Sequence, residues 1–203
     1  MNQKIVIVAD VICPWCFIGK RKLDKKLESS TKAEHLKIDW VPFELDPEMP
    51  FGGQDRITYR TGRFGSVGAS RQMDQKAIEV GQSVGIEFRY DLMTRTPNTF
   101  NAHRLIWWAS KLGIDQGSIV DALFCSYFLQ GQDIGTNETL VGIAVSFGIE
   151  PNRVLEFLNG RTGVEEVRKL EQWIIEQDIE SVPSYIGDQG KLMQGLDSLI
   201  ASL

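Results

Sequence analysis

The stretch that decides the fold is Ile5-Val6-Ile7-Val8-Ala9-Asp10-Val11-Ile12-Cys13-Pro14-Trp15-Cys16-Phe17-Ile18-Gly19. Its first half is a short β-branched apolar run, which is typical of a buried strand. From Pro14 to about Leu27 the apolar residues take helical spacing, so the strand is predicted to lead directly into a helix. Residues 36–41 then alternate apolar and polar side chains, and the first 45 residues therefore predict a β-α-β unit with parallel strands.

Strand patterns occur only near the two ends of the chain. Residues 182–187 return to strand composition after an amphipathic segment at 164–177, and residues 196–203 close the chain as a short helix. The pattern predicts an α/β fold in which residues 1–48 and 161–203 form one discontinuous domain and residues 49–160 form a large all-helical insertion. Where the insertion begins, residues 46–68 are rich in Pro and Gly and predict a loop with one short helical turn.

The helices of the insertion have recognisable ends. Gly85, Gly113 and Gly148 each follow an apolar helical face and precede an isoleucine, which predicts three helices that stop at a left-handed glycine. Ser118 lies just before an apolar run and predicts the start of the helix that carries Cys125. Cys125 is surrounded by large apolar residues on that helix, which favours a buried core thiol over a third redox group.

Composition excludes several classes of function. The chain has 203 residues, and 22 Lys and Arg against 27 Asp and Glu give a net charge of −5 without charged blocks. This balance argues against nucleic acid or an anionic membrane as a partner. The first apolar run is too short for a signal peptide, and no stretch approaches the roughly 20 apolar residues of a membrane span. We therefore expect a cytoplasmic protein, and the sequence does not indicate its oligomeric state.

Three cysteines do not make a disulfide framework, but two of them form a Cys-X-X-Cys pair. Cys13 lies where the strand gives way to the helix, and the positive end of the helix dipole can stabilise its thiolate there. Cys16 lies one turn further in, so we expect Cys13 to be the attacking thiol and Cys16 the resolving one. Half of a zinc site is the alternative, but the chain has too few other soft ligands, and no metal is expected.

Two other residues allow more than one interpretation. Pro183 follows Val182 at the start of a predicted strand, where it is either an edge-strand proline or the second residue of a cis peptide. A cis bond would expose the Val182 backbone for pairing with substrate beside the cysteines. The carboxylate of Asp10 is either a base that accepts the Cys16 proton through water or a cap for the turn that follows the strand.

Four segments resemble a known family: 10–19, which contains Cys13-Pro14-Trp15-Cys16; 42–50; 97–105, which contains Asn98 and His103; and 181–183. Nearly the whole chain resembles the FrnE-like branch of the DsbA family. The resemblance implies a thioredoxin-like fold with a helical insertion, and thiol-disulfide exchange or isomerisation on a protein or small-molecule disulfide. By position it implies Cys13 as nucleophile, Cys16 as resolving thiol and Pro183 as the cis-proline. We expect Pro14, Trp15 and Val182, next to these residues, to bind substrate.

The chain also resembles 2-hydroxychromene-2-carboxylate isomerases and kappa-class glutathione transferases, which have serine in place of Cys13. Asn98 and His103 match positions that face the active site in those relatives. A second hypothesis is therefore a glutathione-dependent isomerase or transferase acting on an aromatic molecule, with glutathione as co-substrate and no other cofactor. A third is a peptide-binding module that uses the scaffold without redox chemistry.

Overall fold

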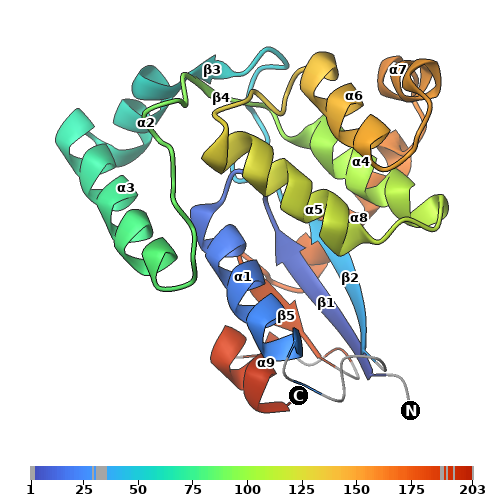
Figure 1. The fold of residues 1–203 in the computed structure, drawn as a ribbon, viewed down its shortest axis with the longest axis horizontal. Coiled ribbons are helices and arrows are strands. Elements are labelled where there is room, and N and C mark those ends of the chain that lie inside the picture. Colours follow the sequence, from blue (N-terminus) through green and yellow to red (C-terminus); the bar gives the residue numbers. More distant parts are fainter. Residues whose placement is uncertain are drawn as a thin grey trace.

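A four-stranded sheet forms the centre of the molecule in the computed structural model, which describes residues 3–28, 30, 36–187, 190, 192–193 and 195–202. The strands are β1 (Gln3–Ala9), β2 (Leu36–Pro42), β5 (Ser184–Ile186) and β6 (Leu192–Met193), in the order β2-β1-β5-β6. β1 and β2 are parallel, while β5 pairs antiparallel with both β1 and β6. Strands from both ends of the chain thus share one sheet (Figure 1).

Alternate residues of β1 face opposite layers. Ile5 and Ile7 belong to the main core together with Phe17 and Leu23 of α1 (Pro14–Glu28). Val8 packs instead with Ile174 of α8 (Val164–Glu176) in a second cluster. The C-terminal helix α9 (Leu196–Ser202) lies beside α1 and β5 (Figure 1). The sheet is therefore apolar on both sides, as a sheet covered by helices on both faces requires.

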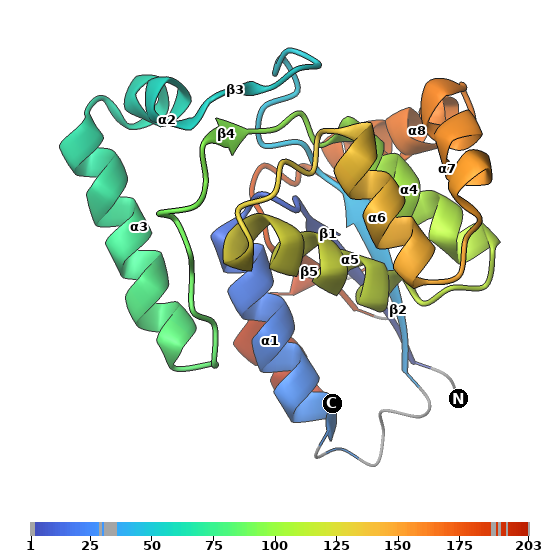
Figure 2. The ribbon, with the colours of Figure 1, turned by 45° about the horizontal axis from the view of Figure 1, so that its top comes forward.

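The segment between β2 and α8 is mainly helical and contains one small antiparallel sheet of two short strands, which α2 and α3 separate in the sequence. Its strands are β3 (Gln54–Asp55) and β4 (Arg95–Thr96), and its helices are α2 (Arg56–Phe64), α3 (Val67–Gln82), α4 (Phe100–Lys111), α5 (Gln116–Phe124), the π-helical turn η2 (Cys125–Leu129), α6 (Asn137–Ser146) and α7 (Pro151–Asn159). Figure 2 shows α2 and α3 on the opposite side of α1 from α4, α6 and α7. Within the described residues, no helix is both long enough and apolar enough for a membrane span.

The insertion shares its core with the sheet domain. The Phe17 ring, directly after Cys16, stacks on Phe124 at 5.0 Å and on Phe128 at 5.9 Å between ring centroids. Phe88, from the loop after α3, meets Phe17 and Phe128 edge-on. Stacked and edge-to-face rings contribute beyond their buried area. The helix that begins directly after Cys13 and carries Cys16 is thus held in place by aromatic side chains of the insertion.

The three predicted glycine stops are confirmed. Gly85, Gly113 and Gly148 all have φ between 75° and 82°. In each case the next isoleucine donates its N–H to a carbonyl five residues earlier, as in Ile86 N to Gly81 O at 2.9 Å. The left-handed residue and this hydrogen bond together form the Schellman stop.

Two helix predictions need correction. The helix predicted to begin at Ser118 begins at Gln116, because the Asp115 side chain caps it by accepting the Ser118 N–H at 2.7 Å. The segment predicted as loop with one short turn contains the whole of α2, which Asp55 caps by accepting the Thr58 N–H at 2.8 Å. Aspartate is a strong N-cap in both places.

Candidate active site

Cys13 and Cys16 lie at the first turn of α1, as predicted. Cys13 precedes Pro14, and its carbonyl accepts the N–H groups of Cys16 at 3.1 Å and Phe17 at 3.2 Å. The Cys13 N–H is held by the Asp10 carbonyl at 3.0 Å. The turn between strand and helix is thus fixed by backbone hydrogen bonds on both sides of Cys13. Both thiols are free and nearly fully buried.

The Val182-Pro183 peptide is cis, the alternative that the sequence left open. Cys13 Sγ lies 3.9 Å from the Val182 carbonyl oxygen, although 169 residues separate the two. A Cβ on Gly19 would overlap the Tyr185 hydroxyl and approach Pro183 Cγ to 3.6 Å. Glycine at position 19 therefore lets α1 approach β5 closely, and this brings Pro183 and Val182 next to the cysteines.

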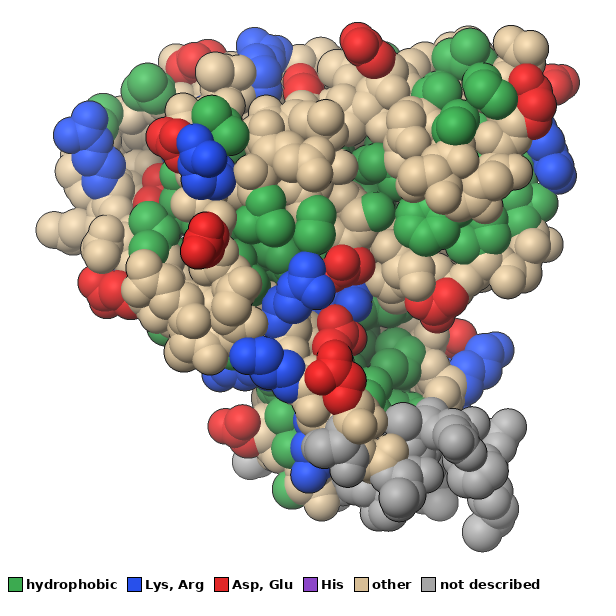
Figure 3. Space-filling view, in the orientation of Figure 1, with side chains coloured by type: hydrophobic (Ala, Val, Ile, Leu, Met, Phe, Trp, Pro, Cys, Tyr) green, Lys and Arg blue, Asp and Glu red, His purple; other side chains and the backbone are tan. Residues whose placement is uncertain are grey.

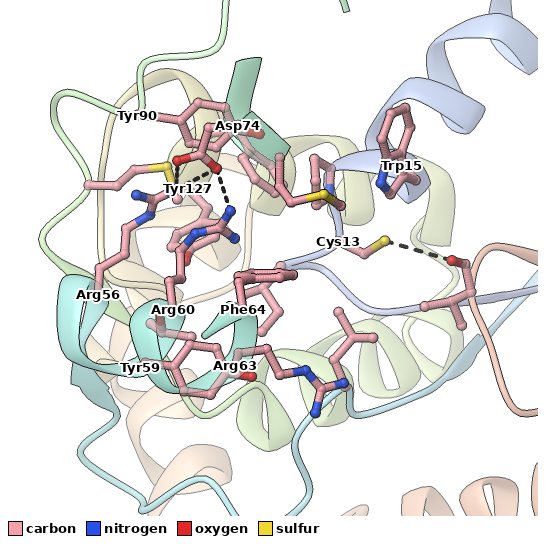
Figure 4. Close-up of a pocket in the computed structure, with 18 residues that line it drawn as sticks. Cys13, Trp15, Arg56, Tyr59, Arg60, Arg63, Phe64, Asp74, Tyr90 and Tyr127 are labelled. Atoms are coloured by element: carbon pink, nitrogen blue, oxygen red, sulfur yellow. Dashed lines mark hydrogen bonds and ion pairs between the residues drawn. The ribbon is translucent and has the colours of Figure 1, made fainter. Parts of the chain in front are cut away.

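A cavity of about 270 Å³ opens beside Cys13 (Figure 4). Its wall on the sheet-domain side includes Pro14, Trp15 and Val182, all three predicted to contact substrate. The insertion supplies the opposite wall, from the residues Arg56, Tyr59, Arg60, Arg63, Phe64, Met73, Asp74, Tyr90, Met93, Thr96, Tyr127 and Phe128. Cys16 is not part of the lining. The arrangement presents one thiol to a ligand and keeps the second behind it.

Asp10 is fully buried and caps the turn that leads to Cys13. Its Oδ2 accepts the Leu45 N–H at 2.7 Å, and its Oδ1 accepts the Ile12 N–H at 3.4 Å. His103 Nε2 lies 3.4 Å from the same Oδ1, at ion-pair distance but outside hydrogen-bond alignment. Burial alone would lower the pKa of His103, but Asp10, Glu44 and Glu171 outweigh it and raise that pKa above its usual value.

Neither Asn98 nor His103 lines the Cys13 cavity. The Asn98 side chain donates to the Met49 carbonyl at 2.8 Å and accepts the Phe100 N–H at 3.0 Å. Its amide thus links the backbone at Met49 to the backbone at Phe100. His103 is buried against Asp10. The sequence placed both residues beside a ligand, whereas the structure places them in the scaffold behind the site.

Cys125 also lies away from the cavity. Its Sγ is 3.4 Å from Arg21 Nη2 and 3.7 Å from Asp121 Oδ2, and burial raises its pKa. A raised pKa disfavours the reactive thiolate. Cys125 is nevertheless half-buried beside two charged side chains, and it is not the fully buried core thiol that the sequence predicted. No group of three or more His, Cys, Asp or Glu side chains suited to a metal occurs in the part of the chain that the structure describes.

Buried Glu44 and half-buried Glu171 form a carboxylate pair near His103. Glu44 and Glu171 both accept from Arg168 Nη1, and Glu44 is 9% exposed. Burial and the neighbouring Glu171 raise the pKa of Glu44 to about 7, although Arg168 and His103 oppose the shift. An acid whose pKa is higher in the folded state stabilises the fold when protonated and loses that contribution as pH rises toward the folded pKa.

Glu44→Gln is therefore expected to become progressively more stable than the wild type as pH rises from about 5 to 8. The change should be about 1–2 kcal/mol, which allows for the solvent that reaches this group. Urea unfolding midpoints at several pH values would measure it. Glu87→Gln, at an exposed glutamate, is the matched control and should follow the wild-type profile. A constant difference between Glu44→Gln and wild type across this range would contradict the raised pKa.

The sequence did not point to the arginines of α2. Arg56, Arg60 and Arg63 recur at intervals of four and three residues, which places them on one face of the helix. Asp74 of α3 binds Arg56 Nη2 at 2.8 Å and Arg60 Nη2 at 2.6 Å. The spacing of the arginines and the Asp55 cap were the available signals, but the glycines on either side indicated a loop.

Comparisons with known proteins agree with this architecture. The chain is 25% identical over 189 residues to the uncharacterized protein YwbO of Bacillus subtilis (strain 168), with 92% of this chain and 87% of YwbO covered. The crystal structure of the probable DsbA oxidoreductase SCO1869 from Streptomyces coelicolor superposes with a TM-score of 0.86 at 24% identity, covering 99% and 88% of the two chains.

The cytosolic disulfide reductase DsbM from Pseudomonas aeruginosa with GSH superposes with a TM-score of 0.68 at 12% identity, covering 98% of this chain and 96% of DsbM. At these identities the two structural matches show the shared fold. The family model for the DSBA-like thioredoxin domain matches residues 4–201, almost the entire chain. With its paired cysteines at the start of α1 and its sheet built from both ends of the sequence, the chain belongs to the DSBA-like thioredoxin domain family of thiol-disulfide oxidoreductases.

Proposed function

We propose that this protein reduces or exchanges disulfides through Cys13 and Cys16. The Cys13 thiolate attacks one sulfur of a substrate disulfide, which breaks that bond, releases one substrate thiolate and leaves a mixed disulfide. The Cys16 thiolate then attacks Cys13 Sγ and releases the second substrate thiolate. Two thiols of the enzyme are oxidised to one disulfide, and the substrate takes up the two electrons. The observation that carries this proposal is the position of Cys13 in the cavity wall beside Val182.

The environments of the two thiols support the division of roles. Cys16 is 2% exposed and lies behind the cavity lining. Burial and the adjacent Cys13 raise the pKa of Cys16 well above its usual value. A thiol that stays protonated and shielded does not meet substrate first. It can attack only a disulfide brought to it, and the mixed disulfide on Cys13 is that disulfide.

The test is to trap the mixed disulfide in a Cys16→Ser variant. With 4,4′-dithiodipyridine, a neutral aryl disulfide, we expect one equivalent of thiopyridone to be released and the other aryl group to stay on Cys13, as seen by intact-protein mass. Reduced wild type should release two equivalents and carry no adduct. Rapid release of two equivalents by Cys16→Ser, or an adduct on Cys125, would overturn the assigned roles.

A reductive direction fits the predicted cytoplasmic location, because the cytosol keeps thiols reduced. Glutathione is then the proposed electron donor, and the neighbour DsbM, a cytosolic disulfide reductase with GSH in its structure, supports that choice. Isomerisation of protein disulfides, which the resemblance to FrnE-like proteins implies, uses the same first attack by Cys13.

The second candidate is a glutathione-dependent isomerase or transferase for an aromatic molecule, favoured by the aromatic rings in the cavity. The Asn98 and His103 side chains, which suggested it, are engaged in the scaffold. The two candidates differ in what they require of Cys16. Disulfide exchange needs Cys16 in every turnover, whereas glutathione-dependent isomerisation should survive Cys16→Ser.

A further inference from the structure

The α2 wall of the Cys13 cavity carries more positive charge than its single carboxylate can balance. The charged residues in the lining are Arg56, Arg60, Arg63 and Asp74, which leave a formal excess of two positive charges. The chain as a whole has a net charge of −5, and the face in Figure 3 shows acidic and basic side chains interspersed. A positive wall beside the reactive thiol therefore departs from the overall charge of the protein.

Two of these arginines are desolvated and share one carboxylate. The side chains of Arg56 and Arg60 are 11% and 17% exposed, and both bind Asp74. Burial and the neighbouring Arg56 lower the pKa of Arg60, although Asp74 opposes this. Arg56 also stacks over the Tyr90 ring at 4.9 Å. Buried cations in excess of their anions raise the energy of the empty site, and an anion that enters it would offset that cost.

Arg63 and Tyr90 have polar groups left for a ligand. Arg63 is exposed at the edge of the cavity, and no ion pair or hydrogen bond joins its guanidinium to any residue that the structure describes. The Tyr90 hydroxyl is buried and likewise has no hydrogen-bond partner among the described residues. Burial raises the pKa of Tyr90, so this hydroxyl remains a donor at neutral pH. Figure 4 shows Tyr90 beside Asp74 and Arg63 on the other side of Phe64, so the two residues offer separate donors at the two ends of this wall.

The size of the cavity limits what the anion can be attached to. Its volume of about 270 Å³ is at the small end of ligand pockets. The rings of Tyr59, Phe64 and Tyr127 also contribute to its lining. The space is therefore suited to one arm of a small disulfide, with an apolar or aryl body against the rings and an anionic end at α2 (Figure 4).

We propose that the α2 arginines form an anion subsite, with Arg63 at its entrance, that selects small disulfides carrying a carboxylate a few bonds from the sulfur. This inference rests on the proposed thiol-disulfide exchange and specifies its substrate class. One half of the bound disulfide places its sulfur at Cys13, and the carboxylate of that half contacts the α2 arginines. Arg63 acts on specificity, and the chemistry of the two thiols does not depend on it.

The experiment compares two aryl disulfides in single turnovers of the reduced full chain. One probe is 5,5′-dithiobis(2-nitrobenzoate), which carries a carboxylate on each ring, and the other is neutral 4,4′-dithiodipyridine. We expect Arg63→Gln to lower the rate constant for the anionic probe about three- to fivefold and to leave that for the neutral probe unchanged. Arg63→Lys should keep most of the preference. Arg161→Gln, at an exposed arginine away from the cavity lining, is the matched control.

The outcomes separate this inference from the proposed function. If Arg63→Gln leaves the ratio of the two rate constants at its wild-type value, the anion subsite is wrong and disulfide exchange stands. If wild type reacts with both probes no faster than a free thiol, the exchange function itself is wrong. A third arm uses cystine-linked peptides with Glu or Gln beside the disulfide. A charge preference found with these peptides and absent with the aryl pair would overturn the assignment to a small molecule.

Discussion

Replacing Cys13 by serine is expected to lower the rate of disulfide reduction by at least about a thousandfold, because it removes the covalent nucleophile. The hydroxyl is similar in size, so the turn held by the Asp10 and Cys13 backbone should persist. Cys16 cannot take over the attack, since it lies outside the lining of the cavity that Cys13 faces and burial raises its pKa. Stopped-flow reaction with 4,4′-dithiodipyridine measures the loss directly.

Cys125→Ser is the matched control for Cys13→Ser. It makes the same sulfur-to-oxygen change at a thiol that lies beside Arg21 and Asp121 and outside the cavity lining. We expect its rate to stay within about twofold of wild type. If Cys13→Ser kept more than a tenth of the wild-type rate, the role of Cys13 as nucleophile would be refuted.

Cys13→Ser also separates the two candidate functions. Serine occupies this position in the isomerases and glutathione transferases that the chain resembles. A glutathione-dependent isomerase would therefore tolerate Cys13→Ser and continue to turn over an aromatic substrate in the presence of glutathione. A disulfide reductase would not, because the hydroxyl cannot form the mixed disulfide. Cys13→Ser is therefore assayed with and without glutathione. Activity that persists with glutathione indicates the isomerase, and loss of activity under both conditions indicates the reductase.

The sequence predicted the parts of the site that depend on local pattern. The apolar run before Cys13 and the proline after it define a strand that leads into a helix, and the structure has that transition at Pro14. Pro183 was harder, because an isolated X-Pro pair does not determine its own isomer. Its pairing with the cysteines in the family resemblance decided the prediction, and the structure confirms the cis bond.

The insertion side of the site could not be predicted, because its contacts join residues far apart in the chain. α2 contains Gly62 and is followed by Gly65, and glycine disfavours helices. The Asp55 cap and the ion pairs of Arg56 and Arg60 with Asp74 stabilise α2 nevertheless. The contact of His103 could not be predicted either. Its partner Asp10 lies 93 positions earlier, and a helical pattern does not indicate such a contact.

Arg104 makes a set of structural hydrogen bonds that the sequence did not indicate. It follows His103 in α4 and is only 3% exposed. Its guanidinium donates to the carbonyls of Phe157, Leu158, Gly160 and Thr162 at 2.8–3.2 Å, and to Asn101 Oδ1 at 2.7 Å. The last carbonyls of a helix have no partner within it and form the negative end of its dipole. Arg104 therefore caps the C-terminus of α7 and ties it to α4.

Arg104→Met is expected to lower the free energy of unfolding by about 3–5 kcal/mol, because it removes charged hydrogen bonds from the buried Phe157 and Leu158 carbonyls, from two more accessible carbonyls and from Asn101. Arg104→Lys should lose less, but a single ammonium with three donors cannot reach all of these acceptors. Urea unfolding followed by tryptophan fluorescence measures both. Arg161→Gln changes an exposed arginine in the same connection between α7 and α8 and should stay within about 0.5 kcal/mol of wild type. A loss below about 1 kcal/mol in Arg104→Met would mean that water replaces the guanidinium, and the link between α4 and α7 would then contribute little to stability.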